Sequence, residues 1–365
     1  MSTLPSLSRA FLLAGTFLVC APACSSDAPG TQGGALGAAG GNAVAGALNA
    51  AGALNTAGAS SAGAASTAGA GGAASGGSAA GAPAAGASGS AAGGGGSHLM
   101  GRSTGCAKTV TELPNAWAAH EIKVTVAAAY AADYGTRPYF TRPPKEYDMN
   151  KAYPVVVWGQ GCGQSKAEET QFSGSAAAAG VIQIELLANP KNHQCYSAGP
   201  DGDHADSPEV PYFDAVLAEV QQNYCVDKSK VYMAGWSSGG WLTALLACTR
   251  TDVIKAVGWA SAGLQLNHPE CVGPMPAILE RGVDDGGTPL AQTEQARESL
   301  RVRNGCSTET EPWDPGEKDF DTSTCVSYKG CNAGFPLVWC PIPGGHNNGG
   351  KLASVGYWKL WSSLP

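Results

Sequence analysis

Residues 235–239 (Gly-Trp-Ser-Ser-Gly) match the pattern Gly-x-Ser-x-Gly, which carries a nucleophilic serine in one class of hydrolases. The apolar run 231–234 before this segment predicts a strand, and the run 241–248 after it predicts a helix. On such a tight strand-to-helix turn the backbone is strained, the glycines leave room for the bend, and the serine hydroxyl projects outward. We therefore predict Ser237 as the nucleophile.

A serine hydroxyl is a poor nucleophile near neutral pH, so it needs a base, and the base needs a carboxylate that orients it. In this kind of site the partners follow in the chain order serine, acid, histidine. His346 is the only one of the six histidines that follows the acid candidates, Asp284 and Asp285. These aspartates come directly after a predicted strand, where open α/β sheets place their sites. The residues thus predict a triad of Ser237, His346 and one of the two aspartates.

Hydrolysis at a serine also requires donors for the oxyanion, and backbone N–H groups are well suited because they need no reorganisation. We expect one donor at Ser238, directly after the nucleophile. For the other we assign the amide of Cys162, with Gly161 as the nearest alternative, in a glycine-rich loop after the first predicted strand. Trp158, Trp236 and Trp241 lie beside these motifs and could stack on an aromatic acyl group. Core packing is the alternative that we expect for at least two of them.

The elements that must position these residues alternate along the chain. Short apolar, β-branched runs predict strands, and longer amphipathic runs predict helices. This alternation predicts an α/β fold with a mostly parallel, doubly wound sheet and helices on both faces. The predicted strands are 153–158, 181–187, 231–234, 253–259, 275–279 and 335–339. One predicted helix begins at Ser207-Pro208-Glu209, with Ser207 as its N-cap, and the others cover 241–248, 292–302 and 352–361.

The first hundred residues have a different composition. Residues 1–23 read as a signal peptide with one positive charge, an apolar run and an Ala-Pro-Ala sequence before Cys24. We expect Cys24 to be the lipid-attachment site of a bacterial lipoprotein, with free secretion as the alternative. Residues 24–104 then form an Ala/Gly/Ser-rich linker that has almost nothing to bury and is expected to be disordered. Residues 105–365 form the catalytic domain.

Cysteine usage and charge limit the classes of function. Ten cysteines in an exported domain predict up to five disulfides. The alternative, a metal site from Cys325, Cys331, Cys340 and His346, lacks the short Cys-x-x-Cys loop of structural zinc sites, so we expect no metal and no cofactor. A formal net charge of −7 without a basic run argues against nucleic acid as a partner. Membrane contact is expected only through the lipid anchor, and the chain is expected to be a monomer.

Several of these motifs occur together in one known family. In combination they resemble the polyhydroxybutyrate depolymerase and feruloyl esterase family of α/β-hydrolase esterases over about residues 153–361. The motifs that carry the resemblance are Gly161-Cys162 after a strand, the Gly-Trp-Ser-Ser-Gly-Gly turn at 235–240, Gly282-x-x-Asp285, Asn304-Gly305-Cys306 with Tyr328-Lys329-Gly330-Cys331, and Gly344-Gly345-His346.

The resemblance implies an α/β-hydrolase fold with Ser237 as nucleophile, His346 as base and Asp285 rather than Asp284 as acid. It also implies a disulfide between Cys306 and Cys331. The chain departs from the family at Gln160, where the family has His, and at 347–348, where it has Trp-Pro and this chain Asn-Asn. Those positions line the substrate side in the family, so Gln160 is a predicted substrate contact, and Trp236, which lies beside Ser237, is the other.

The resulting expectation is an exported serine carboxylic-ester hydrolase. Its favoured substrate is a hydroxycinnamoyl (feruloyl) ester of a polymeric plant polysaccharide, because a tethered, exported enzyme suits such a substrate. A polyhydroxybutyrate depolymerase is the alternative within the same chemistry. Outside that chemistry, the alternatives are a non-catalytic carbohydrate-binding lipoprotein and a peptidase with the same triad.

Overall fold

Ten strands form one sheet in the part of the chain that the structure, a computed structural model, describes. That part comprises residues 101–112, 115–164, 180–189, 191, 195–198, 207–264, 271–316, 324–346 and 353–365. The chain divides into two units, Met1–Ala84 and Ala85–Pro365, and every described residue lies in the second. The predicted signal peptide (1–23), the predicted lipidation site Cys24, and the predicted linker (24–104) up to residue 100 lie outside the described residues.

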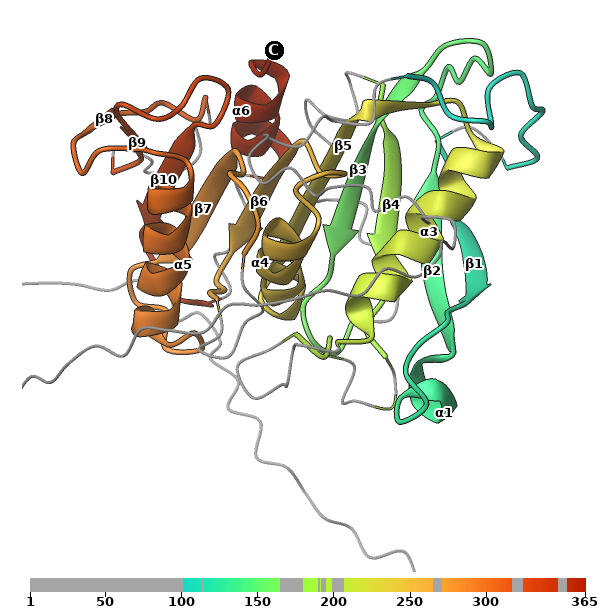
Figure 1. Cartoon of the computed structure of the whole chain (residues 1–365), viewed down its shortest axis with the longest axis horizontal. Helices are drawn as coiled ribbons and strands as arrows, with labels where there is room; N and C mark the ends of the chain where they lie inside the picture. Colours follow the sequence, from blue (N-terminus) through green and yellow to red (C-terminus); the bar gives the residue numbers. More distant parts are fainter. Residues whose placement is uncertain are drawn as a thin grey trace, which may run out of the picture. The chain divides into compact units, whose positions relative to one another are not determined.

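The centre of the sheet is parallel and its two edges are antiparallel (Figure 1). The strand order is β1-β2-β4-β3-β5-β6-β7-β10-β9-β8, and all pairs from β4 to β10 along this order are parallel. At one edge β2 (Thr136–Arg142) and β1 (Ala118–Lys123) run antiparallel to their neighbours, and at the other edge β9 (Val326–Tyr328) and β8 (Thr310–Pro312) do so. The parallel strands are β3 (Tyr153–Gly159), β4 (Ile182–Leu186), β5 (Val226–Trp236), β6 (Ala256–Ala260), β7 (Ala277–Gly282) and β10 (Leu337–Ile342).

Side chains of the central strands alternate between two hydrophobic cores, one on each face of the sheet. In β3, Val155 and Val157 belong to the core on the face covered by α3 (Glu209–Asn223), α4 (Ser238–Thr249) and α5 (Leu290–Arg303), while Val156 and Trp158 belong to the core on the opposite face. That opposite core includes Tyr357 and Trp361 from the C-terminal helical segment. Because successive side chains of a strand point to opposite faces, a strand covered on both sides must be apolar at nearly every position. The run Tyr-Pro-Val-Val-Val-Trp meets that demand.

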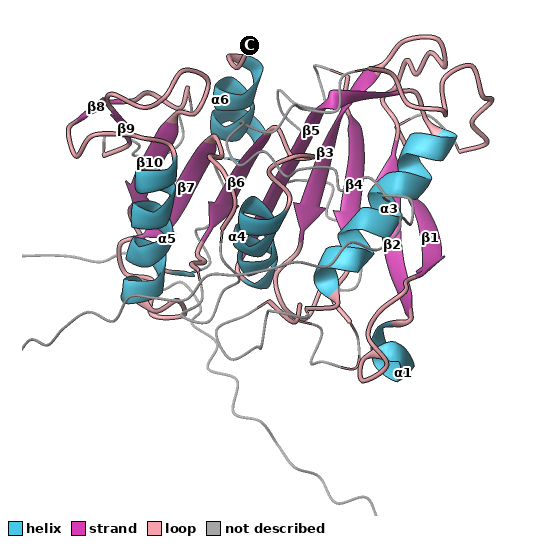
Figure 2. Cartoon of the chain, viewed as in Figure 1, coloured by secondary structure: helices cyan, strands magenta, loops and turns pink. Residues whose placement is uncertain are grey.

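Helices cover both faces of the sheet (Figure 2). The helices are α1 (Ala131–Tyr134), α3 (Glu209–Asn223), α4 (Ser238–Thr249), α5 (Leu290–Arg303), the π-helix η2 (Ala353–Tyr357) and α6 (Trp358–Ser362). The predicted α/β-hydrolase fold, with a mostly parallel, doubly wound sheet and disulfides, is therefore confirmed. No helix in the described ranges combines the length and the apolar character that crossing a membrane requires.

The structure adds strands that the sequence pattern did not predict. These are the antiparallel edge strands β1 (Ala118–Lys123), β2 (Thr136–Arg142), β8 (Thr310–Pro312) and β9 (Val326–Tyr328). The predicted start of α3 was also wrong by one residue. Pro208, not Ser207, is the N-cap, and the Ser207 hydroxyl instead accepts a hydrogen bond from the Glu209 amide at 3.3 Å.

Five disulfides join the ten cysteines of this domain. The pairs are Cys106–Cys225, Cys162–Cys195, Cys248–Cys271, Cys306–Cys331 and Cys325–Cys340. The pair that the family resemblance implied, Cys306–Cys331, is among them. All three cysteines of the alternative metal site are in disulfides, so their thiols are not available as ligands. No group of three or more metal-ligating side chains occurs among the described residues.

Candidate active site

Ser237 lies on the turn between β5 and α4, in a backbone conformation that few side chains adopt. Its φ is 53° and its ψ is −120°, so this non-glycine residue is strained. The turn requires small neighbours, because a Cβ at Gly235 would lie 2.2 Å from the carbonyl oxygen of Gly239. A Cβ at Gly239 would lie 1.9 Å from the carbonyl oxygen of Gly159 on the neighbouring strand β3. The glycines therefore let α4 start directly against the sheet.

Ser237, His346 and Asp285 form one hydrogen-bonded chain. His346 Nε2 lies 2.8 Å from Ser237 Oγ, and His346 Nδ1 lies 2.9 Å from Asp285 Oδ1. The three residues follow β5, β7 and β10, whose carboxyl ends meet at the same edge of the sheet. With a neutral imidazole, Nδ1 donates to the carboxylate and Nε2 accepts the serine proton, which is the arrangement that a general base at Ser237 requires.

Asp285, and not its neighbour Asp284, contacts His346. The Asp285 side chain is fully buried, and its Oδ1 also accepts hydrogen bonds from the amides of Gly287 (2.8 Å) and Thr288 (3.1 Å). Burial acts to raise the pKa of Asp285, but the hydrogen bond and charge of His346 and the Gly287 amide outweigh it and lower that pKa. Asp284 is exposed. The carboxylate that the family motif implied is thus the one beside the imidazole.

The predicted oxyanion donors lie on either side of the Ser237 turn. Ser238 is the first residue of α4, where the helix provides no carbonyl acceptor for its N–H. Cys162 follows β3, whose end Gly159 pairs with Gly235 of β5, so the loop after β3 starts beside the turn. A Cβ at Gly161 would lie 2.5 Å from the Trp236 ring, which shows how closely this loop approaches the indole. Whether Cys162 or Gly161 supplies the second N–H stays a prediction.

A segment that sequence reasoning missed connects these two donor positions. Cys195 is disulfide-bonded to Cys162, and the amide of the next residue, Tyr196, donates to the Ser238 hydroxyl at 2.8 Å. The buried Tyr196 hydroxyl donates to the carbonyl of Leu186 and accepts from the amide of Gln160. No motif marked Tyr196, although its place beside Cys195 would have pointed to the loop once the disulfide pairing was known.

The tryptophans near the site divide into core and surface. Trp158 and Trp241 are buried in the hydrophobic cores. Trp236 is partly exposed, its ring centroid lies 5.5 Å from that of His346, and its indole N–H donates to the His346 carbonyl at 3.1 Å. Trp236 is therefore the one of these three that a substrate beside His346 could reach.

Gln160 does not fit the predicted substrate contact, which we correct here. Its side chain is fully buried, and its amide nitrogen donates to the buried carboxylate of Glu185 on β4 at 2.6 Å. The side-chain amide of Gln160 thus links the loop after β3 to the neighbouring strand β4. The second departure from the family, at 347–348, lies outside the described residues.

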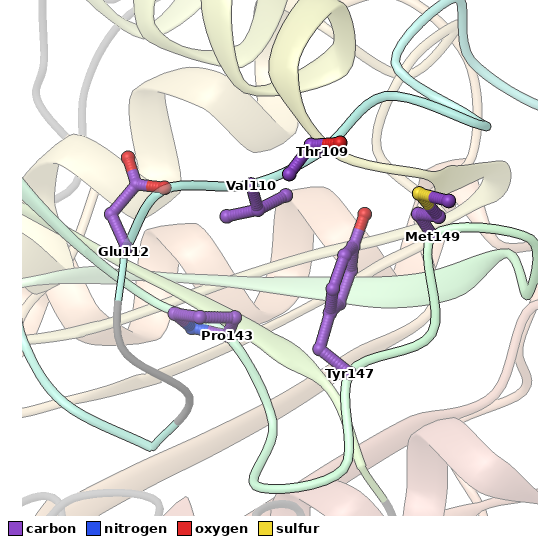
Figure 3. A pocket seen from close by; sticks show the side chains of 6 residues that line it. All are labelled: Thr109, Val110, Glu112, Pro143, Tyr147 and Met149. Carbon is purple, nitrogen blue, oxygen red and sulfur yellow. The ribbon is translucent and has the colours of Figure 1, made fainter.

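A separate hollow is lined by residues that precede β3 or lie in loops near it (Figure 3). It has a volume of about 210 Å³ and is lined by Thr109, Val110, Glu112, Pro143, Tyr147 and Met149. Tyr147 and Met149 precede β3, so they lie near its amino end, whereas Ser237 follows the carboxyl end of β5. The hollow therefore takes no part in the Ser237 site.

Comparisons with known proteins bear on this site. Feruloyl esterase D of Neurospora crassa is 29% identical over 220 residues, which cover 58% of this chain and 74% of that protein. A probable feruloyl esterase C of Aspergillus clavatus is 28% identical over 244 residues, which cover 62% of this chain and 83% of that protein. No protein-family model matches the chain.

A solved structure also matches the chain. It is a CE1 ferulic acid esterase from Anaeromyces mucronatus in complex with ferulic acid, with a TM-score of 0.40 and 14% identity over 68% of this chain and 90% of that chain. The fold assignment of the present chain rests on its own strand order and on the turn at Ser237.

Proposed function

We propose that this chain, which is similar in sequence to feruloyl esterases of the α/β-hydrolase fold, is a serine carboxylic-ester hydrolase. The hydrogen-bonded chain Ser237–His346–Asp285 carries the proposal. Its geometry suits attack of the Ser237 hydroxyl on an ester carbonyl, with His346 taking the proton. His346 then returns that proton to the leaving alkoxide, and a water activated by the same imidazole hydrolyses the acyl-enzyme.

The acid and the oxyanion donors complete this mechanism. Asp285, ionised and held by two backbone amides, keeps Nδ1 of His346 protonated and stabilises the imidazolium while it exists. The negative charge on the carbonyl oxygen would be received by the amide of Ser238 and by one from the loop after β3, Cys162 or Gly161. Removing one such donor typically costs on the order of 3 kcal/mol of transition-state stabilisation.

The substrate we propose is a hydroxycinnamoyl ester of a plant polysaccharide. The relatives named above are feruloyl esterases, and the partly exposed Trp236 ring beside His346 offers a face on which an aromatic acyl group can stack. The five disulfides support an extracytoplasmic place of action, because such bonds persist in oxidising compartments. We further propose that the chain acts as a monomer.

Two assays test this proposal at two levels. Wild-type protein should hydrolyse p-nitrophenyl acetate, and Ser237→Ala should not. An active Ser237→Ala variant would contradict the assignment of the nucleophile, and an inactive wild type would favour a non-catalytic carbohydrate-binding protein.

The second assay identifies the substrate. Release of ferulate from methyl ferulate, without clearing of a polyhydroxybutyrate film, is the expected result. Clearing of the film without release of ferulate would instead identify a polyester depolymerase.

A further inference from the structure

Ser261 is a buried residue beside the triad that no sequence motif marked. It follows β6 directly, and β6 lies between the strands that carry Ser237 and Asp285. Its side chain is fully buried, and its φ is 52°, in the left-handed region. A non-glycine residue in that region is held there against an intrinsic backbone preference, so the surrounding structure must fix it.

Two hydrogen bonds to the main-chain groups of Ser261 hold it in this conformation. Its amide donates to the carbonyl of Glu280 on β7 at 3.0 Å. Its own carbonyl accepts a hydrogen bond from the hydroxyl of Thr288 at 2.8 Å, and the amide of Thr288 in turn donates to Asp285. The backbone of Ser261 is therefore tied to the strand and the loop that carry the acid.

The Ser261 hydroxyl lies near both the base and the acid. It donates to the main-chain carbonyl of His346 at 3.3 Å, the same carbonyl that accepts a hydrogen bond from the indole N–H of Trp236, the residue before Ser237. It also lies near enough to the Asp285 carboxyl to be one of the groups that lower its pKa, although no hydrogen bond joins the two in the described part of the chain. A hydroxyl carries one proton and can rotate, so it can serve either acceptor.

Of the two oxygens of the Asp285 carboxylate, Oδ2 is the one that could accept a hydrogen bond from the Ser261 hydroxyl. Oδ1 accepts from His346, Gly287 and Thr288. Oδ2 is buried, and no hydrogen bond of normal geometry reaches it from the described part of the chain. Negative charge left on a buried oxygen is costly, and a nearby hydroxyl that can turn toward it reduces that cost.

We propose that Ser261 is a positioning residue for the ester hydrolysis, its hydroxyl fixing the main chain of His346 and turning to the Asp285 carboxylate as the imidazolium forms. This role rests on the proposed function, because it acts through the same His346–Asp285 pair. Ser261 does not touch the substrate. It keeps the His346 imidazole and the Asp285 carboxylate in the relative positions that transfer of the Ser237 proton requires.

Two substitutions separate the hydroxyl from the backbone conformation. Ser261→Ala removes the hydroxyl and keeps the Cβ, whereas Ser261→Gly removes the hydroxyl and adopts a positive φ without penalty. If the hydroxyl matters, both variants should lose roughly tenfold to a hundredfold in kcat on methyl ferulate, the loss expected for a buried hydrogen bond to a charged group, with KM nearly unchanged. A glycine variant with wild-type kcat would overturn the proposal, because the position would then matter only for its conformation.

A double-mutant cycle with Asp285→Asn distinguishes action through the triad from general weakening of the fold. If Ser261 acts through Asp285, Ser261→Ala should cost much less in the Asp285→Asn background than in the wild type, since coupled residues are not additive. Equal fold-losses in the two backgrounds would contradict the proposal. Ser103→Ala is the matched control, because Ser103 is also a buried serine, and its hydroxyl donates to the carbonyl of Tyr224 and accepts from the amide of Val226, at the amino end of β5 and away from the triad.

All variants are made in the full chain, and kcat is expressed per folded protein. Ser103→Ala should keep kcat while lowering the melting temperature, and a drop in kcat like that of Ser261→Ala would show that the loss of any buried serine hydroxyl has the same effect. If Ser261→Ala does not fold, the unstrained Ser261→Gly variant carries the test. A wild-type chain without esterase activity would overturn the proposed function, and this role with it, whereas an active wild type with unchanged Ser261 variants would overturn this role alone.

Discussion

Asp284 and Asp285 are chemically identical neighbours in different surroundings, and this difference allows a test at the scale of single residues. Asp285 is buried and bonded to His346, whereas Asp284 is exposed. We expect Asp285→Asn to lower kcat by roughly 10³- to 10⁴-fold, because an amide cannot hold the imidazole in the required tautomer or stabilise its charged form. Asp284→Asn is the matched control and should stay near wild-type kcat on p-nitrophenyl acetate. Equal losses in the two variants would show that the acid is assigned wrongly.

The lowered pKa of Asp285 also predicts a pH dependence of folding stability. A carboxyl whose pKa is lower in the folded than in the unfolded state stabilises the fold above its unfolded value of about 3.9, and this contribution is lost as pH falls through the folded value. The free energy of unfolding should therefore fall more steeply in wild type than in Asp285→Asn as the pH is lowered below about 4. Urea titrations at several pH values measure this, and parallel curves for the two proteins would contradict it.

The sequence predicted the proposed catalytic residues better than the residues that hold them. Motif and chain order indicate Ser237 and His346, but they leave Asp284 and Asp285 open, and only the resemblance to the family motif Gly-x-x-Asp favours Asp285, the one that the structure places beside His346. Tyr196 and Ser261 carry no such signal, because their roles depend on which strands become neighbours and on the Cys162–Cys195 pair. Gln160 was misjudged for a related reason, since its burial follows from the partner Glu185 on β4, which no local pattern indicates.

At the scale of elements, the turn between β5 and α4 depends on space that only glycine leaves. The Cβ of Gly239→Ala would lie 1.9 Å from a carbonyl oxygen of β3, so α4 or the strand must shift. We expect a loss of about 3 kcal/mol or more in the free energy of unfolding, at the upper end for an overpacked core. Gly286→Ala is the control, because nothing lies within 4 Å of its added Cβ. Thermal unfolding of both variants measures the difference, and equal melting temperatures would contradict this packing.

The central strands were predictable and the edge strands were not, for a physical reason. A strand buried on both faces, such as β3, needs a continuous apolar run, and that run stands out in the sequence. An edge strand such as β1 alternates partly exposed and exposed positions with only Ile122 buried, and β8 is exposed throughout its three residues. Such short, mixed segments become strands because a neighbour offers a partner, which their own residues do not reveal.

At the scale of the whole molecule, we propose that an acylated Cys24 holds the catalytic domain at a bacterial envelope through the linker. In a bacterial host with a lipoprotein pathway, esterase activity of the full chain should sediment with membranes, because acyl chains add about 0.8 kcal/mol of membrane affinity per buried CH₂. Cys24→Ala should move that activity to the soluble fraction. Cys20→Ala, which alters a cysteine in the segment expected to be removed, is the control and should stay with the membranes. Soluble wild-type protein would indicate free secretion instead.

The most direct measurement is covalent labelling of the chain with a fluorophosphonate, followed by mass spectrometry of its peptides. Such a reagent phosphonylates a serine that a neighbouring base activates. We expect a single adduct on Ser237 in the wild type and none in His346→Ala, because the unassisted hydroxyl reacts poorly. An adduct on another serine, or an unlabelled chain that still hydrolyses esters, would contradict the assignment of this nucleophile and its base.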